Sequence, residues 1–155
     1  MADARTVANR FLDLAREKER SLTPMQLLKL VYIAHGWTLG LTGKPLINQK
    51  IEAWQYGPVI RSLYNLVRGY GRDVITAPIP AFPEDLSNAE DGLIQQVYDL
   101  YGDLSGIQLS NITHMPGTPW FETYEAGSFG KVIPNDLIAA HYRQLDTERE
   151  SSQHQ

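Results

Sequence analysis

The chain has 155 residues, which suits one ordinary domain with one hydrophobic core. Its composition, 43% hydrophobic and 21% charged, lies near the average for globular proteins and far from disordered or collagen-like chains. It contains no cysteine, which excludes disulfides, thiolate catalysis and zinc sites that need sulfur. No apolar run approaches the length of a membrane span, so we expect a cytoplasmic protein without a membrane partner.

Charge is divided unevenly along the chain, although the whole carries only −4. Residues 1–72 hold eleven Lys/Arg and five Asp/Glu, a net +6, whereas residues 73–155 hold three and thirteen, a net −10. The favoured interpretation is that two oppositely charged parts of one domain lie side by side. The alternative is a DNA-binding transcriptional regulator that uses the basic half, although the overall acidity makes nucleic acid an unexpected partner.

Helical periodicity dominates the first third of the chain. Residues 3–19 carry an apolar stripe typical of an amphipathic helix. Thr23 followed by Pro24 predicts a capped start for a second helix that runs to about Thr42. Apolar residues occupy two faces of this second helix, so we expect neighbours to enclose it. Its third face carries Gly36, Gly40 and Gly43, which predicts the close approach of another backbone.

A small ribbon and further helices are expected after this central helix. Residues 46–56 alternate as a short strand, for which residues 73–76 are the expected antiparallel partner. Gly57-Pro58 predicts a turn into a third helix with Val59, Leu63, Leu66 and Tyr70 on one face. Residues 77–86 contain three prolines and are interpreted as an extended crossover within one domain.

The remaining segments complete a mainly α prediction. Ser87 to Glu90 forms a capping box for a fourth helix, a short helix is expected at 107–114, and Thr118-Pro119 starts another helical turn. Asn135 begins a last helix, and residues 146–155 are predicted to be a disordered polar tail. We therefore expect one compact multi-helix domain over residues 1–145 with a small two- or three-stranded antiparallel β ribbon.

Catalytic and metal-binding motifs are missing from the sequence. Phosphate-binding loops, dinucleotide fingerprints and nucleophile elbows are absent, and the four histidines lack ligand spacing. We therefore predict no enzyme, no metal and no cofactor. His35 is interpreted as a hydrogen-bonded core residue, and Lys29 and Glu52 are expected to form a semi-buried pair. The rival enzymatic hypothesis combines His114 with Glu52 or Asp103.

Aromatic and arginine residues cluster between the predicted strand and the third helix. Trp, Tyr and Arg are the residue types most enriched at interface hot spots. A core role for the aromatic pair is equally consistent with the pattern, and stacking on single-stranded nucleic acid is the least favoured interpretation. The predicted partner-binding residues are Trp54, Tyr56, Pro58, Arg61 and Tyr64.

Two ordered blocks give the sequence a family resemblance. The first comprises residues 27–36 (LLKLVYIAHG), 43–46 (GKPL) and 52–59 (EAWQYGPV), and the second comprises 109–114 (LSNITH) followed by Pro119-Trp120. Together they strongly resemble the Panacea domain of SocA-like antitoxins and phage-associated GepA-like proteins, over roughly residues 7–145. The family-signature residues are Lys29, Tyr32, Glu52, Trp54, Tyr56, Gly57, Pro58, Thr113, His114, Pro119 and Trp120.

The resemblance implies a bacterial antitoxin that neutralises, by direct contact, a toxin encoded beside it. In this family the partner toxins are diverse, and at least some members act as adaptors that deliver the toxin to the ClpXP protease. The expected partners are therefore a cognate protein toxin and ClpXP.

Overall fold

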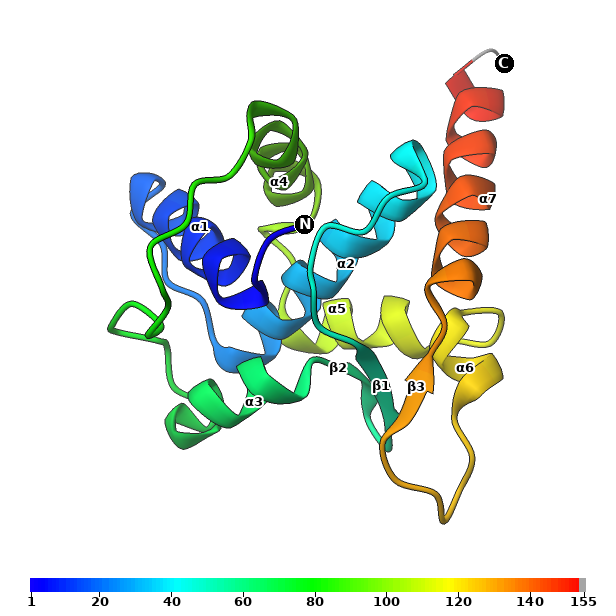
Figure 1. The fold of residues 1–155 in the computed structure, drawn as a ribbon, viewed down its shortest axis with the longest axis horizontal. Coiled ribbons are helices and arrows are strands. Elements are labelled where there is room, and N and C mark those ends of the chain that lie inside the picture. The colour runs from blue at the N-terminus through cyan, green and yellow to red at the C-terminus, as the bar shows by residue number, and fades with distance from the viewer. Residues whose placement is uncertain (154–155) are drawn as a thin grey trace.

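The computed structural model describes residues 1–153 and confirms a mainly α single domain with a small antiparallel sheet (Figure 1). None of the helices in this range combines the length and apolar character needed to cross a bilayer. In chain order the elements are α1 (Ala4–Glu17), α2 (Pro24–Thr42), β1 (Ile51–Trp54), β2 (Gly57–Val59), α3 (Arg61–Val67), the 3₁₀ turn η1 (Arg68–Tyr70), α4 (Asn88–Tyr101), α5 (Gly106–His114), α6 (Pro119–Thr123), β3 (Lys131–Ile133) and α7 (Asn135–Gln153).

Helix α2 is the central element, as its two apolar faces predicted. The Thr23 side chain accepts a hydrogen bond from the Gln26 amide, and the Gln26 side chain accepts one from the Thr23 amide. Gly43 ends the helix in the left-handed conformation, with φ of 74°. Between these ends α2 packs against α1, α4, α5 and α7 (Figure 1) and is buried over most of its length.

Glycines on α2 allow α7 to lie directly on it. A Cβ added at Gly40 would lie 2.7 Å from Tyr142 Cβ and 3.0 Å from the Tyr142 carbonyl carbon, and one added at Gly36 would clash with the Tyr142 ring. The predicted close approach is therefore confirmed at these two positions. It is wrong for Gly43, where a Cβ would meet nothing within 4 Å; that glycine serves the helix end instead.

The sheet differs from the predicted ribbon. Its order is β2-β1-β3, with β1 antiparallel to both neighbours, so the partners of β1 are residues 57–59 and 131–133 rather than 73–76. The 73–76 stretch instead lies beside the segment after α1, where the Ile75 amide donates to the Leu22 carbonyl. Val59 belongs to β2, so α3 begins only at Arg61 and buries Leu63 and Val67.

His35 is a core residue, as predicted, and its hydrogen bonds join three segments. Its Nδ1 accepts from the amides of Leu46 and Ile47, and its Nε2 therefore donates to the Asn135 side chain at the start of α7. Burial lowers the pKa of this histidine, which keeps the ring neutral.

The C-terminal segment also differs from expectation. Helix α7 continues to Gln153, into the segment 146–155 that the sequence predicted to be a disordered polar tail; residues 154–155 lie outside the described part. Contacts one helical turn apart support the extension, because the Gln144 side chain donates to Glu148. The Arg149 guanidinium also lies 5.4 Å from the Trp37 ring centroid on α2, within cation–π range.

Candidate functional site

The two signature blocks meet at the β1–β2 hairpin. Trp54 pairs with Gly57, so Gln55 and Tyr56 form its two-residue tip. Three side chains from three helices donate hydrogen bonds to carbonyl groups of this hairpin: Trp120 Nε1 of α6 to Trp54 (2.6 Å), Ser110 Oγ of α5 to Tyr56 (3.4 Å), and Lys29 Nζ of α2 to Pro58 (3.1 Å). Residues distant in sequence thus fix one short segment.

Lys29 lies beneath the hairpin without a carboxylate partner among the described residues. Its side chain is 5% exposed, and burial lowers its pKa to about 8. The predicted pair with Glu52 is wrong. Successive residues of β1 face opposite sides of the sheet, so buried Ala53 faces inward and Glu52 faces outward, where it binds Arg61.

Gly57 is required by this arrangement. Its φ of 127° lies in the region that side chains rarely adopt, and an added Cβ would lie 2.8 Å from Lys29 Nζ. The same Cβ would lie 3.9 Å from His114 Cβ, so the α5 signature residue packs against the hairpin as well.

Residues of the second signature block contact one another and the backbone of their own helix. His114 Nδ1 lies 3.3 Å from Ser110 Oγ, and its ring meets the Trp120 ring edge-on at 5.6 Å. Thr113 Oγ1 donates to carbonyls of the preceding turn, and Pro119 occupies the first turn of α6. On α2, buried Tyr32 packs edge-on against Tyr142, and burial raises its pKa.

The enzymatic arrangement around His114 is not formed in residues 1–153. Glu52 is bound by Arg61 and Asp103 by Arg20, and neither carboxylate hydrogen-bonds His114. That part of the chain also contains no cluster of three or more potential metal ligands.

The outward side of the hairpin carries an aromatic cluster around one arginine. Arg61 lies 5.5 Å from the Trp54 ring and 5.2 Å from the Phe129 ring, and Trp54 packs at 4.9 Å against Tyr64. Tyr56, at the tip, is 76% exposed, and Phe129 is 71% exposed. We call Trp54, Tyr56, Arg61, Tyr64 and Phe129 the hairpin surface.

Glu52 orients this surface. It accepts two hydrogen bonds from Arg61, at 2.6 and 3.0 Å, and one from Trp54 Nε1 at 3.2 Å. The Arg61 guanidinium is the main reason that the pKa of Glu52 is lowered. The ion pair thus fixes both the arginine and the half-buried indole.

Three of the five predicted partner-binding residues, Trp54, Arg61 and Tyr64, pack together, and Tyr56 lies exposed at the hairpin tip. The fifth does not belong to this surface. Pro58 is buried on the inward side, where its carbonyl receives Lys29. Sequence reasoning missed Phe129, which follows Gly127-Ser128 in the loop before β3. Its only signal in the sequence was an aromatic residue in a short segment bounded by Gly127 and Gly130.

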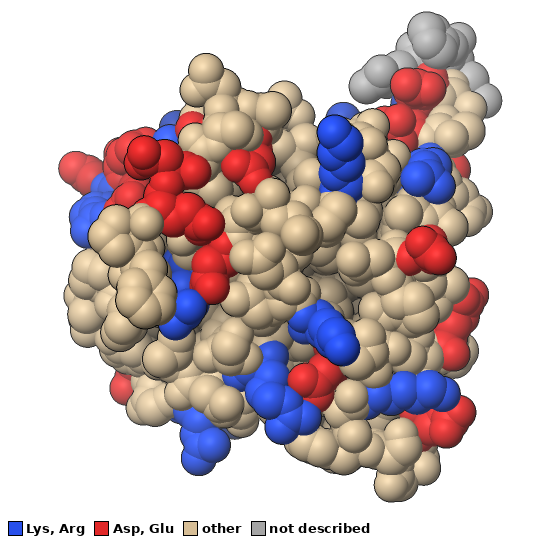
Figure 2. Space-filling model, viewed as in Figure 1, with Lys and Arg blue, Asp and Glu red and all other residues tan. Residues whose placement is uncertain are grey.

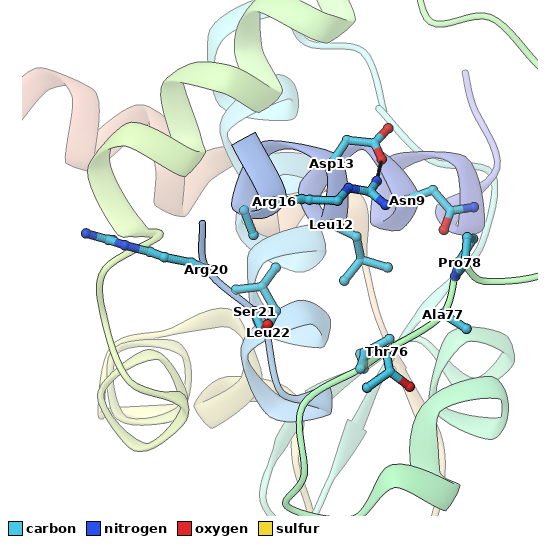
Figure 3. A pocket seen from close by; sticks show the side chains of 12 residues that line it. Asn9, Leu12, Asp13, Arg16, Arg20, Ser21, Leu22, Thr76, Ala77 and Pro78 are labelled. Atoms are coloured by element: carbon cyan, nitrogen blue, oxygen red, sulfur yellow. Dashed lines mark hydrogen bonds and ion pairs between the residues drawn. The ribbon is translucent and has the colours of Figure 1, made fainter. Parts of the chain in front are cut away.

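Hollows elsewhere do not involve these residues. A groove of about 500 Å³ lies between α1 and the 75–78 segment (Figure 3). Apolar Leu12 and Leu22 line part of it, and the ion pair of Asp13 and Arg16 lies at its side. None of the predicted site residues lines this groove.

Basic and acidic side chains from the two parts of the chain are interleaved. Figure 2 shows Lys and Arg around α3 and the strands, and Asp and Glu beside α1 and along α7. Arg10 binds Asp91 and Arg20 binds Asp103, each joining the basic to the acidic part. Because these arginines are already paired, this arrangement favours the side-by-side interpretation over a continuous DNA-binding face.

Comparison with known proteins gives two matches, one to a family model and one to a single protein. The family model described as "Antitoxin SocA-like, Panacea domain" matches residues 27–121, which include β1, β2 and both signature blocks. Antitoxin SocA of Caulobacter vibrioides is 33% identical over 129 residues, which cover 76% of this chain and 68% of that protein. No solved structure matches the chain significantly. These matches support an antitoxin role and a non-enzymatic one. The chain belongs to the family of SocA-like antitoxins with a Panacea domain.

Proposed function

We propose that this protein is an antitoxin that neutralises a cognate protein toxin by direct contact through the hairpin surface. The observation that carries the proposal is the exposure of large aromatic groups on and beside the β1–β2 hairpin, which hydrogen bonds hold from its inward side. Tyr56 at the hairpin tip and Phe129 beside the stacked Arg61 present most of their side chains to solvent. Soluble proteins rarely expose such groups together unless a partner covers them.

The fixed backbone strengthens this proposal. Hydrogen bonds from Lys29, Ser110 and Trp120 hold the hairpin before any partner arrives. Binding then costs less conformational entropy, because the contact residues are already ordered. This account assigns the signature residues beneath the hairpin to support, and the exposed aromatic groups to contact.

Co-expression tests the antitoxin function. The protein encoded beside this chain should arrest growth when expressed alone and should be harmless when this chain is expressed with it. A tagged copy of this chain should recover that protein from its native host in a stoichiometric complex. If the neighbouring protein is harmless alone, or toxic in both conditions, the proposal is wrong.

A second part of the proposal concerns disposal of the toxin in the cytoplasm. The family resemblance supports an adaptor role in which this chain delivers bound toxin to the ClpXP protease. The half-life of the toxin should then be short in cells that contain both this chain and ClpX, and should lengthen when either is removed. An unchanged half-life with preserved neutralisation would leave blocking by contact as the mechanism.

A DNA-binding role would show itself differently. Retention of promoter DNA that weakens steeply with salt would mark a regulator. We expect no such retention, because five of the eleven basic side chains of residues 1–72 form ion pairs and a sixth, Lys29, is buried.

A further inference from the structure

The surface formed by α5 and the loop after it carries no charged side chain. Residues 104–121 are the longest run of the chain without Asp, Glu, Lys or Arg. The next longest, 30–43, is largely buried within α2, whereas residues 104–121 expose large apolar side chains. These are Ile107, Ile112, Met115 and Phe121, which are 38–70% exposed. Depletion of charge, with methionine and aromatic residues present, is typical of the centre of a protein interface, so this surface indicates a partner.

A groove borders this surface on the side of α7. Its volume is about 420 Å³, and its lining is mostly apolar. Ile112 and Met115 line it from α5 and the following loop, Leu145 lines it from α7, and Ile33 lines it from α2. The groove can therefore receive apolar side chains of a partner.

Two carboxylates lie at the groove without a cationic partner. Glu148 lines it directly, as does His141. Burial lowers the pKa of His141, and the negative charges of Glu122 and Glu148 act on it in the opposite direction, so both carboxylates lie near this ring. Within residues 1–153 neither glutamate forms an ion pair, and Glu148 accepts a hydrogen bond from the neutral Gln144 amide.

The basic side chains of the surrounding elements lie elsewhere or are already paired. None of the described lysines and arginines lines the groove. On α7, Arg149 lies against the Trp37 ring, and Arg143 lines a separate hollow between α2 and the start of α7. On β3, which packs beside α6, Lys131 is bound by Glu125. The groups at the groove itself therefore make it negative.

This charge distinguishes between two kinds of occupant. In a symmetric pair of copies joined through the groove, the same carboxylates would approach each other, which is unfavourable. A lysine or arginine of a different protein would instead be attracted to Glu122 and Glu148.

The groove is also continuous with the β1–β2 hairpin across α5. Ser110 donates to the hairpin, and His114 packs against it. Ile112 follows Ser110 by two residues and so lies about 200° around the helix, on the side of the groove. The exposed α5 residues between these two sides are the uncharged Ile107, Gln108 and Asn111. A partner that covers the hairpin tip can therefore extend into the groove without burying a charge of α5.

We propose that the groove receives an apolar segment of the toxin that carries a lysine or arginine, whose cationic group pairs with Glu148 and Glu122. The inference rests on the proposed function and adds a second contact to the hairpin surface. Apolar side chains of the segment cover Ile112 and Met115, and the cationic group supplies the partner that the two carboxylates lack in the free chain.

Charge reversal on two sides of α7 tests the ionic contact. Glu148→Lys places a positive charge at the groove, whereas Glu150→Lys makes the same change about 200° around the helix, at an exposed residue that does not line the groove. The dissociation constant for the purified neighbouring protein should rise more than about tenfold for Glu148→Lys and less than about twofold for Glu150→Lys. Circular dichroism and thermal unfolding check that both variants fold.

A second pair of measurements separates the apolar contact from the ionic one. Met115→Ser removes an apolar side chain that is 50% exposed, so the dissociation constant should rise more than about fivefold. The affinity of the unsubstituted chain should fall as salt rises, and this fall should be shallower for Glu148→Gln.

Each proposal can fail separately. Equal binding by Glu148→Lys and Glu150→Lys would overturn the inference and leave the proposed function intact. A free protein that self-associates, and becomes monomeric as Met115→Ser, would assign the groove to a second copy and overturn the inference as well. A neighbouring protein that fails to bind the unsubstituted chain would remove both proposals.

Discussion

The two sides of the β1–β2 hairpin differ in what they contribute. On the inward side Lys29, Ser110 and Trp120 are largely buried and donate to hairpin carbonyls. Tyr56 at the hairpin tip and Phe129 on the outward side are mostly exposed, and the Phe129 ring also packs against Trp54 and Arg61. The residues that make the family recognisable therefore lie mostly where they support the hairpin, whereas its exposed residues are free to meet a partner. Substitutions on the inward side should therefore destabilise the fold more than substitutions on the outward side.

Removal of Trp120 should have the largest effect on stability. Trp120→Ala deletes a side chain that is only 8% exposed, so the free energy of unfolding should fall by about 3–5 kcal/mol. Trp120→Phe keeps most of the ring and loses the bond to Trp54, so it should cost about 1–2 kcal/mol. Urea denaturation measures both. A loss below about 1 kcal/mol for the alanine variant would contradict an inward, supporting role.

Lys29 should make stability depend on pH in the alkaline range. Burial lowers its pKa from 10.5 to about 8, so between these values the unfolded chain binds the proton that the folded chain has lost. The penalty of the buried charge is complete below about pH 8 and disappears as pH rises toward 10.5. The unsubstituted protein should gain on the order of 3 kcal/mol relative to Lys29→Met across this window.

The comparison with Lys29→Met is needed because tyrosines also titrate there. Burial raises the pKa of Tyr32 and Tyr142, so their unfolded forms lose protons first and stability falls at high pH in both proteins. The difference between the two unfolding curves isolates Lys29. If that difference is independent of pH, the ammonium is not buried as described.

Glu52 should matter least for stability, since its pair with Arg61 lies on the outward side. Arg61 is 47% exposed, so Glu52→Gln should lower the free energy of unfolding by no more than about 1 kcal/mol. Thermal or urea unfolding at neutral pH measures the change. A loss comparable to that of Trp120→Ala would show that the outward side also supports the fold.

Local signals in the sequence predicted much of the fold. Thr23-Pro24 gave the start of α2, and the face with Gly36 and Gly40 indicated the close contact that α7 makes. The polar position of His35 within an apolar helix correctly indicated a hydrogen-bonded core residue. These features depend on neighbours along the helix, which short-range patterns describe well.

Long-range pairing was not predictable in the same way. The Gln55-Tyr56 tip lacks the Asn-Gly type of signal that marks two-residue hairpins, and Pro58 argued against a strand. β3 has only three residues and follows β1 by about eighty positions, so nothing local identified it. The expected Lys29–Glu52 pair failed for the same reason, because the side of the sheet that each residue faces depends on those pairings.

The central claim is that the outward side of the hairpin contacts the toxin. Its most direct test is the affinity of a Trp54→Ala, Tyr56→Ala double variant for the purified neighbouring protein, beside Phe82→Ala. Phe82 is a matched control, since it is 79% exposed but lies in the 77–86 segment rather than on the hairpin surface. The account predicts at least about a thirtyfold loss for the folded double variant and less than about a twofold change for Phe82→Ala. Full affinity in a folded double variant would contradict it.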